Sequence, residues 1–485
     1  MQAPDIVPVI PELVLLAAAC VILLVEPFLK AGKTAILAIA LAGLVGSLAV
    51  SLGLLGQDRV AFAGMVVFND WAIFFKVLFA AAAGLTILMS SSYLEAHRRH
   101  LGEYYALVLF AVIGMNLMAA SRDFILFYVA LELMAISSYL LAAFFRYRVR
   151  SNESSLKYFL TGSFASAIML YGISLVYGQA GSTNFEAVGR ALGAEGATVG
   201  VIFAVFLVAI GLAFKVSAAP FHMWTPDVYQ GAPTPVAAFF SVGPKAAAFS
   251  VIMAAFIVAF PGTAVQWGVL FIVLSVVTML AGNLFALVQT NVKRMLAYSS
   301  IAHAGYLLAG VGAMGWSKNS YPGQGVLIYL AAYTFMNLGA FGVLTYLKAQ
   351  QPDTFNYSLS RMAGLGRRSP WAGVLLSLFL LSLAGIPGTA GFIGKFYVFG
   401  AVVRADLVWL AVIGVLLSAV SVYYYLRVII FMFFKEPEEE YAVKGPITGG
   451  MAVALAVSAI ATLAIGVAPS WLWDAVVSSF ATLFR

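Results

Sequence analysis

The stretch Leu207–Trp224 reads LVAIGLAFKVSAAPFHMW and carries Lys215 and Pro220 inside an otherwise apolar run. Proline removes a helix hydrogen bond and clashes with the preceding turn, so a helix through this stretch has to break. Inside a bilayer such a break is tolerated only where protein or a wet cavity satisfies the freed backbone groups. The stretch therefore predicts a discontinuous membrane helix with a lysine beside its break.

A second stretch has the same ingredients. Residues Leu381–Phe399 read LSLAGIPGTAGFIGKFYVF, in which Gly385, Pro387 and Gly388 precede Lys395. Paired broken helices related by an inverted repeat are typical of transporters. The alternative is two ordinary proline kinks, and the lysine beside each break favours the repeat.

The composition agrees with a membrane protein. The chain has 485 residues, of which 63% are hydrophobic and 10% are charged, whereas a soluble domain carries roughly 25% charged residues. Its mean hydropathy is +0.99, which excludes a water-soluble fold. The net charge of +7 reflects orientation in the membrane and not nucleic-acid binding. The single cysteine, Cys20, cannot form an internal disulfide or hold an iron–sulfur cluster.

We expect an all-α polytopic protein, because apolar runs of about 20 residues recur along the chain. The seventh and twelfth runs are too long for one span and contain the two breaks. These breaks lie an odd number of spans apart, so their helices run in opposite directions. The C-terminal segment Trp471–Arg485 predicts a short interfacial helix. The fourteen expected spans lie at about 9–28, 34–55, 71–92, 103–120, 123–143, 156–178, 199–230, 234–260, 265–288, 294–313, 325–347, 370–402, 406–433 and 447–468.

The basic residues predict the orientation, because loops on the cytoplasmic side are enriched in Lys and Arg. With both termini outside the cytoplasm, the outer side holds only Arg59, Arg122, Arg190, Lys318, Arg404 and Arg485. The inner loops then hold Lys30, Lys33, Arg98, Arg99, Arg146, Arg148, Arg150, Lys157, Lys293, Arg294, Lys348, Arg361, Arg367, Arg368, Lys435 and Lys444.

Five ionisable residues fall near the middle of expected spans: Glu132, Lys215, Lys245, His303 and Lys395. Such groups are costly in a bilayer and mark ion or proton paths. Burial favours the neutral forms of glutamate and lysine, whereas an opposite charge nearby favours the charged forms. In a Glu–Lys pair the charged and neutral forms can therefore be close in free energy, so that the pair releases a proton when one partner moves. Histidine can join such a relay.

Other interpretations remain for single residues. Glu132 and Lys215 could form a static ion pair, Lys245 could extend to the interface, and His303 could be a satisfied core histidine. Lys76 lies only a few residues into the third run and is expected to extend to the interface. His222, just past the first break, could line a proton uptake path or cap backbone groups.

Motifs for redox or nucleotide chemistry are missing from the sequence. GVGAMG at Gly310–Gly315 matches GxGxxG but ends a membrane run without βαβ context. The histidines at 97, 100, 222 and 303 have no haem or metal spacing, and Ser154–Ser155 and Ser299–Ser300 have no nucleophile partners. We therefore expect no metal, no cofactor and no direct electron transfer in this chain.

Three segments carry a family resemblance: Phe214–Phe249 (FKVSAAPFHMWTPDVYQGAPTPVAAFFSVGPKAAAF), Gln289–Leu308 (QTNVKRMLAYSSIAHAGYLL) and Leu381–Phe399. The chain resembles the antiporter-like subunits of respiratory complex I over nearly its whole length. In detail it is most similar to the subunit N family of bacterial NADH:quinone oxidoreductase. Lysine at position 395, where some sister subunits have glutamate, favours this family over subunit M. The long lateral helix of subunit L has no counterpart.

The resemblance implies fourteen helices with two inverted five-helix repeats and one proton channel. The implied units are residues 1–102 (helices 1–3), 103–260 (first repeat), 265–433 (second repeat) and 434–485 (helix 14 and the interfacial segment). Glu132 and Lys215 match the family's pair on helices 5 and 7. Lys245 matches its central lysine, and Lys395 the residue near the outer exit.

The resemblance also implies the setting. NADH, FMN, iron–sulfur clusters and quinone would belong to partner subunits. The partners would be other membrane subunits, namely an antiporter-like neighbour and small helical subunits, within the bacterial inner membrane. The expected function is proton translocation coupled to distant quinone reduction. One alternative is a cation/proton antiporter subunit of a multi-subunit sodium/proton exchanger, and another is a purely structural scaffold.

Overall fold

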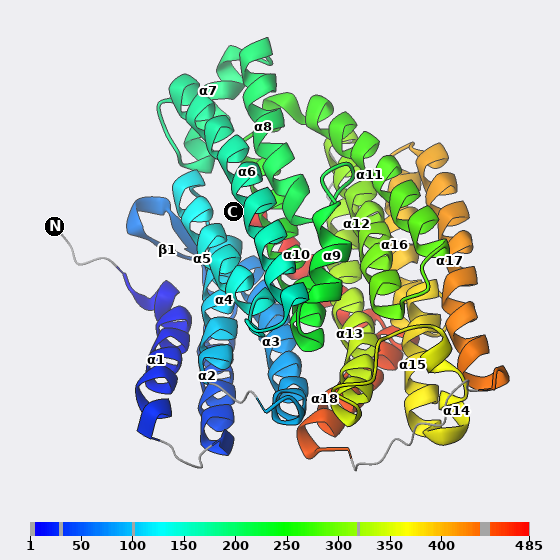
Figure 1. Ribbon diagram of the computed structural model, residues 1–485. Coiled ribbons are helices and arrows are strands. Elements are labelled where there is room, and N and C mark those ends of the chain that lie inside the picture. The colour runs from blue at the N-terminus through cyan, green and yellow to red at the C-terminus, as the bar shows by residue number, and fades with distance from the viewer. Residues whose placement is uncertain (1–4, 29–32, 99–101, 318–320, 437–446, 485) are drawn as a thin grey trace.

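The computed structural model describes residues 5–28, 33–98, 102–317, 321–436 and 447–484, and it is a helical bundle (Figure 1). Of the basic residues used for orientation, Lys30, Arg99, Lys318, Lys444 and Arg485 lie outside these ranges, as does His100. The long helices are α1 (Ile10–Val25), α2 (Lys33–Gly53), α3 (Asp70–Ala96), α4 (Gly102–Ala120), α5 (Phe124–Ala142), α6 (Val149–Ala180), α8 (Val199–Lys215), α10 (Thr234–Val258), α11 (Ala264–Leu287), α12 (Val292–Ser317), α13 (Tyr321–Gln350), α15 (Pro370–Ala384), α16 (Ala390–Arg404), α17 (Val408–Phe434) and α18 (Gly449–Val467).

Shorter elements connect or extend these helices. They are α7 (Phe185–Glu195), α9 (Trp224–Gly231), α14 (Leu365–Arg368), α19 (Ser470–Ala481), strands β1 (Arg59–Ala61) and β2 (Val66–Phe68), and 3-10 turns at Val7–Val9, Glu26–Phe28, Phe62–Gly64, Pro261–Thr263, Ser360–Met362 and Thr482–Phe484.

The predicted membrane bundle is confirmed. Within the described ranges, 11 helices are long and apolar enough to cross a membrane. Three further expected spans complete the series. α12 has 26 residues but is more polar, because it carries charged groups in its first turn and a central histidine. The other two are the interrupted pairs α8–α9 and α15–α16.

Both predicted breaks are present. α8 ends at Lys215, Ser217 follows with a φ of +64°, and α9 begins only at Trp224, beyond Pro220. α15 ends at Ala384 and α16 begins at Ala390. Gly385 and Gly388 have φ values of +92° and +84°, on either side of Pro387. Glycine adopts this left-handed region without the penalty that a side chain brings.

The sequence did not predict the small hairpin between α2 and α3. Strands β1 and β2 pair antiparallel with Arg59 opposite Phe68, and Arg59 forms a 3.2 Å ion pair with Asp5 ahead of α1. Each strand has three residues, too short for an alternating pattern to stand out beside long apolar runs. In the part of the chain that the structure describes, this hairpin is the one pair of strands and the long elements are all helices.

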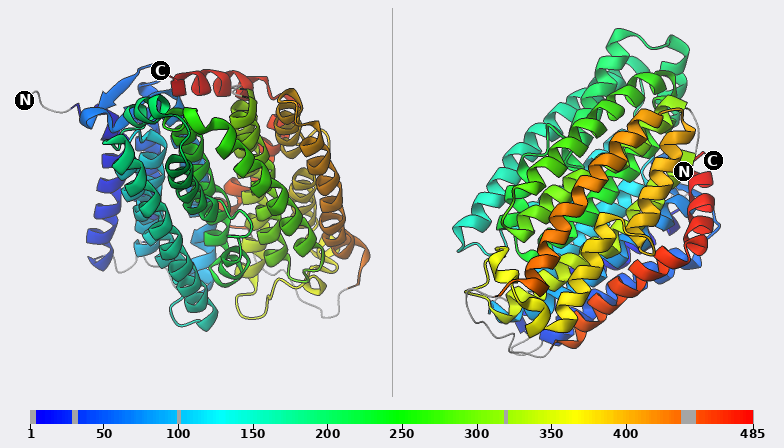
Figure 2. Two further views of the ribbon diagram at one scale, coloured as in Figure 1. Left: turned by 90° about the horizontal axis from the view of Figure 1, so that it is seen from above. Right: turned by 90° about the vertical axis from the view of Figure 1, so that its right-hand side faces the viewer.

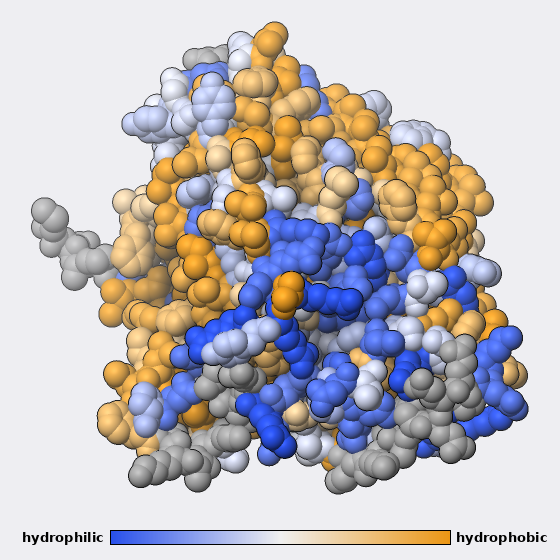
Figure 3. Space-filling model, in the orientation of Figure 1, coloured by the Kyte–Doolittle hydropathy of each residue, from blue (hydrophilic) through white to orange (hydrophobic). Residues whose placement is uncertain are grey.

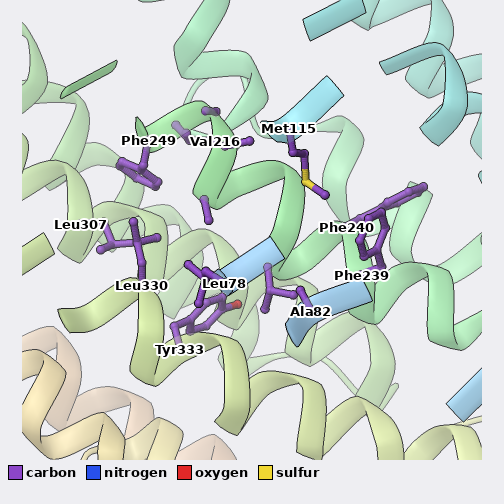
Figure 4. Close-up of a cluster of buried hydrophobic side chains, with 14 of the residues drawn as sticks. Leu78, Ala82, Met115, Val216, Phe239, Phe240, Phe249, Leu307, Leu330 and Tyr333 are labelled. Atoms are coloured by element: carbon purple, nitrogen blue, oxygen red, sulfur yellow. The ribbon is translucent and has the colours of Figure 1, made fainter. Parts of the chain in front are cut away.

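The core lies around α10 and α13. Of an 18-residue apolar segment of α13, 94% of the residues are buried, whereas the corresponding share for the span that contains α1 is 33%. Figure 4 shows buried side chains from several helices of this region, among them Met115 of α4, Phe240 and Phe249 of α10, Leu307 of α12 and Tyr333 of α13. Charged groups placed between α10, α12 and α13 are therefore shielded from lipid by the outer helices.

The two ends of the described chain lie at the same end of the bundle (Figure 2). α19 runs across that end, where Asn69 donates to the main-chain oxygen of Thr482 at 3.0 Å. This agrees with an even number of crossings and with the predicted terminal interfacial helix. Figure 3 shows a broad apolar surface, with hydrophilic residues gathered around the place of α9 in Figure 1.

Candidate functional site

The first group of the predicted relay lies around the end of α8. Lys215 is 4% exposed, and among the described residues its Nζ has no hydrogen-bond partner. The nearest rings are those of Tyr139 and Phe214, with centroids at 5.8 Å and 5.9 Å. Glu132 accepts a hydrogen bond from the Ser166 hydroxyl instead. The predicted pair is thus not in direct contact, and a static ion pair is not what the structure contains.

The central lysine is held by α12. Lys245, in the middle of α10, is buried and donates to the Ser300 hydroxyl at 2.6 Å and to the Ser300 main-chain oxygen at 3.0 Å. The Tyr229 ring centroid lies 6.0 Å from the same ammonium group. A lysine enclosed in this way does not extend to the interface, so that alternative for Lys245 is wrong.

His303 lies one turn further along α12, and hydroxyl groups surround its ring. Nδ1 is hydrogen-bonded to the hydroxyl of Tyr329, and Nε2 lies 3.2 Å from that of Tyr425. The Tyr425 hydroxyl in turn bonds the Ser299 hydroxyl. Each of these hydroxyls both donates and accepts, as a proton relay requires. His303 is therefore a buried histidine with both nitrogens partnered.

Lys395 lies at the second break and is fully partnered. Its Nζ donates to the main-chain oxygens of Leu383 at 2.9 Å and Ala384 at 2.8 Å, and to the Ser418 hydroxyl at 2.8 Å. These two carbonyls end α15, so the ammonium group satisfies acceptors that the break has freed. The Tyr306 ring centroid lies 5.4 Å away.

His222 lies in the linker between α8 and α9 and is half-buried. Its ring faces that of Phe285 on α11, with centroids 6.5 Å apart, and its main-chain oxygen accepts from the Thr225 amide. This places the side chain beside the break, and its part in proton uptake stays a prediction.

Sequence reasoning missed the hydroxyl groups that join the charged ones. Tyr425 and Tyr329 lie more than 25 residues from His303 along the chain, and only tertiary packing brings them to its ring. The one local signal was the spacing of Ser299, Ser300 and His303, which places Ser300 and His303 on one helix face. The tyrosines had no signal beyond their position in apolar runs.

The expectation for Lys76 was wrong. Lys76 is 3% exposed and forms a 2.8 Å ion pair with Glu12 of α1, while its Nζ lies 4.5 Å from the Phe68 ring centroid. A buried acid from another helix compensates its charge, so it has no need to extend toward water.

In chemical terms, the site consists of three buried lysines and one histidine, and hydroxyl groups contact Lys245, His303 and Lys395. Such an arrangement can hold, give up and pass on protons. Within the described ranges no group of three or more His, Cys, Asp or Glu side chains could hold a metal ion.

Comparison with known proteins agrees with this architecture. Residues 121–421 match the family described as NADH:quinone oxidoreductase/Mrp antiporter, TM. NADH-quinone oxidoreductase subunit N of Trichlorobacter lovleyi is 45% identical over 466 residues, covering 95% of this chain and 94% of the relative.

Solved structures give the same picture. A chain in a structure of respiratory complex I from Thermus thermophilus has 33% identity and a TM-score of 0.80, covering 97% of this chain and 100% of that one. A chain of the Mrp complex from a Dietzia species has a TM-score of 0.85, covering 99% of this chain and 97% of that one. At 21% identity the Mrp likeness concerns the fold alone. The long match to the subunit N relative carries the assignment, and the chain belongs to the NADH-quinone oxidoreductase subunit N family.

Proposed function

We propose that this chain is the antiporter-like membrane subunit of a proton-pumping NADH:quinone oxidoreductase and carries protons through Glu132, Lys215, Lys245, His303 and Lys395. The observation that carries the proposal is the set of three buried lysines inside one helical bundle, of which Lys245 and Lys395 donate to serine hydroxyls. Such charges are expensive to keep in a bilayer. A structural scaffold would have no use for three of them.

The proposed setting follows from the family. The chain would lie in the bacterial inner membrane beside an antiporter-like neighbour and small helical subunits, with both termini on the periplasmic side. NADH, FMN, iron–sulfur clusters and quinone would bind to other subunits. Moving one charge across 100 mV costs about 2.3 kcal/mol, so quinone reduction in other subunits would supply the free energy for proton translocation. The four units 1–102, 103–260, 265–433 and 434–485, with inverted repeats in the middle two, are part of this proposal.

The test uses inverted membrane vesicles in which NADH:quinone turnover and proton pumping are measured together. Lys245→Ala is expected to lose both, while a native gel still contains the assembled complex. Lys435→Ala is the matched control, because Lys435 is exposed at the end of α17. If Lys245→Ala keeps wild-type turnover and pumping, the relay is not a proton path, and the interpretation as a structural scaffold is favoured.

A second candidate is a subunit of a multi-subunit sodium/proton exchanger, because the matching family description also includes Mrp antiporters. It predicts sodium/proton exchange in vesicles without NADH. It also predicts that the chain does not purify with NADH dehydrogenase activity. The leading proposal predicts the reverse for both measurements.

A further inference from the structure

A cluster of charges ties α9, the second half of the first broken helix, to both of its neighbours. Asp227 of α9 lies 2.8 Å from Lys157 Nζ of α6 and 2.7 Å from Arg294 Nη1 of α12. Lys157 also pairs with Glu153 at 2.7 Å, and Arg294 donates to Gln230 Oε1 at 2.9 Å. We call Lys157, Asp227 and Arg294 the α9 clamp.

A polar cavity opens beside the α9 clamp. Its volume is about 220 Å³, and its lining includes Arg150, Glu153, Lys157, Asp227 and Gln230. The side chains of Lys157, Asp227 and Arg294 are 44%, 33% and 28% exposed. Ion pairs this accessible to water contribute little net stability and break easily. Water therefore reaches α9 from this side, through contacts that are easy to open.

A stack of aromatic rings extends from Phe214, next to Lys215, to Trp224 of α9 and Tyr158 of α6. Trp224, the first residue of α9, stacks on Tyr158 with ring centroids 4.4 Å apart and planes 8° apart. The Trp224 ring also packs on that of Phe214, with centroids 5.2 Å apart, and its indole nitrogen donates to the Phe214 main-chain oxygen at 3.2 Å. Trp224 and Tyr158 are 5% and 2% exposed. We call Phe214, Trp224 and Tyr158 the aromatic stack.

The stack and the clamp come from the same two helices. Tyr158 directly follows Lys157 on α6, and Trp224 precedes Asp227 by three residues, about one helical turn, on α9. The Lys215 ammonium lies 5.9 Å from the ring centroid of Phe214, a member of the stack. Any shift of α9 that breaks the clamp must therefore also move Trp224.

We propose that the aromatic stack is the gate between the polar cavity and Lys215, and that the α9 clamp positions α9 so that this gate stays closed. This inference rests on the proposed function, since it concerns how protons reach Lys215. Among the described residues the Lys215 ammonium has no hydrogen-bond partner, which fits a group that exchanges its proton only when a barrier opens. The ion pairs of the α9 clamp are partly exposed to water, so a small movement of charge can break them and free α9.

The first test measures passive proton leak in inverted vesicles that contain the assembled complex, with an imposed pH gradient and no NADH. Trp224→Ala is expected to raise the leak several-fold. Asp227→Asn, which removes the charge shared by Lys157 and Arg294, is expected to raise it less. Trp224→Phe and Asp227→Glu should restore values near wild type. Trp316→Phe is the control, because Trp316 is 45% exposed at the far end of α12.

The second test measures access to position 215 directly, so that it does not depend on turnover. Cys20 is the only cysteine, and in a Cys20→Ala background Lys215→Cys provides a single buried thiol. A small cationic methanethiosulfonate reagent should modify this thiol several-fold faster when Trp224→Ala or Asp227→Asn is added. If these changes leave the modification rate and the leak at the parent values, the gate is refuted.

Failure of the gate can be told from failure of the proposed function with Lys215→Met in the same vesicles. If Lys215→Met abolishes pumping while Trp224→Ala changes neither leak nor thiol access, the proton path stands and the aromatic stack is only packing. If Lys215→Met pumps normally, the proposed function falls as well. If Trp224→Ala loses the chain from the complex, the accessibility measurement on Asp227→Asn decides.

Discussion

The two broken helices solve the same problem in different ways. A break frees backbone groups that lipid cannot satisfy. At the first break the Ala219 amide donates to the Thr278 hydroxyl of α11 at 2.8 Å, and the Trp224 indole caps Phe214. At the second break the Lys395 ammonium itself caps two carbonyls of α15.

This difference assigns different work to the two lysines. Neutral groups from elsewhere satisfy the first break, so Lys215 takes no part in holding it together. Lys395 is bound into the backbone of the second break and has to be replaced by another donor before it can move. We infer that Lys215 is free to exchange its proton, whereas Lys395 combines a structural role with its place on the proposed path.

The largest expected effect comes from Lys215→Met, which would separate transport from stability. We expect coupled proton pumping to fall by at least about tenfold, with the amount of assembled complex unchanged. The melting temperature of the purified complex should stay equal or rise, because removing a buried cation that makes no hydrogen bond removes its desolvation cost. Lys435→Met serves as the control. Loss of the chain from the complex would mean that Lys215 supports the fold as Lys395 does. That result would contradict the proposed difference between the two lysines.

The sequence predicted the features of this comparison that depend on local residue type. Pro220, Pro387, Gly385 and Gly388 mark breaks because proline and glycine act on their own turn of helix. The spans could be counted because a run of about 20 apolar residues is itself long enough to cross a bilayer. The burial of Lys215 is consistent with its place within an apolar run.

The sequence could not predict how the charged groups are partnered. Whether Lys215 touches Glu132, or Lys76 touches Glu12, depends on how helices rotate and pack, and no periodicity encodes this. The hydroxyl groups of Tyr329 and Tyr425 look like any other aromatic positions in an apolar run. Tertiary packing alone turns them toward His303.

A second, smaller effect is expected from Lys395→Met, which tests the structural side of the contrast. The change leaves the Leu383 and Ala384 carbonyls buried without their donor, which should cost about 2–4 kcal/mol of stability. The measurement is the melting temperature of this chain in the purified complex, compared with Lys215→Met. Equal melting temperatures for the two variants would contradict the view that only Lys395 holds its break together.

Gly391→Ala addresses the backbone of the second break. A Cβ at Gly391 would lie 1.8 Å from the Ser382 main-chain oxygen, so α16 could no longer start so close to the end of α15. We expect a loss of about 1–3 kcal/mol, as for other overpacked sites, read as a lower melting temperature. Gly400→Ala is the matched control on the same helix, since a Cβ there meets nothing within 4 Å. A Gly391→Ala protein as stable as this control would show that the two half-helices can separate without cost.

The smallest effect is expected from Ser418→Ala, which removes one of the three acceptors around Lys395. The two carbonyls remain, so the ammonium stays at the break with one bond fewer, and the loss should be near 1 kcal/mol, on the order of a single hydrogen bond. Ser377→Ala is the control, because that hydroxyl only donates to Gly373 in its own helix at 2.8 Å. If Ser418→Ala lowers the melting temperature as much as Lys395→Met, then the α17 contact and not the backbone carbonyls anchors Lys395. In that case the second break, like the first, depends mainly on a hydroxyl group from a neighbouring helix.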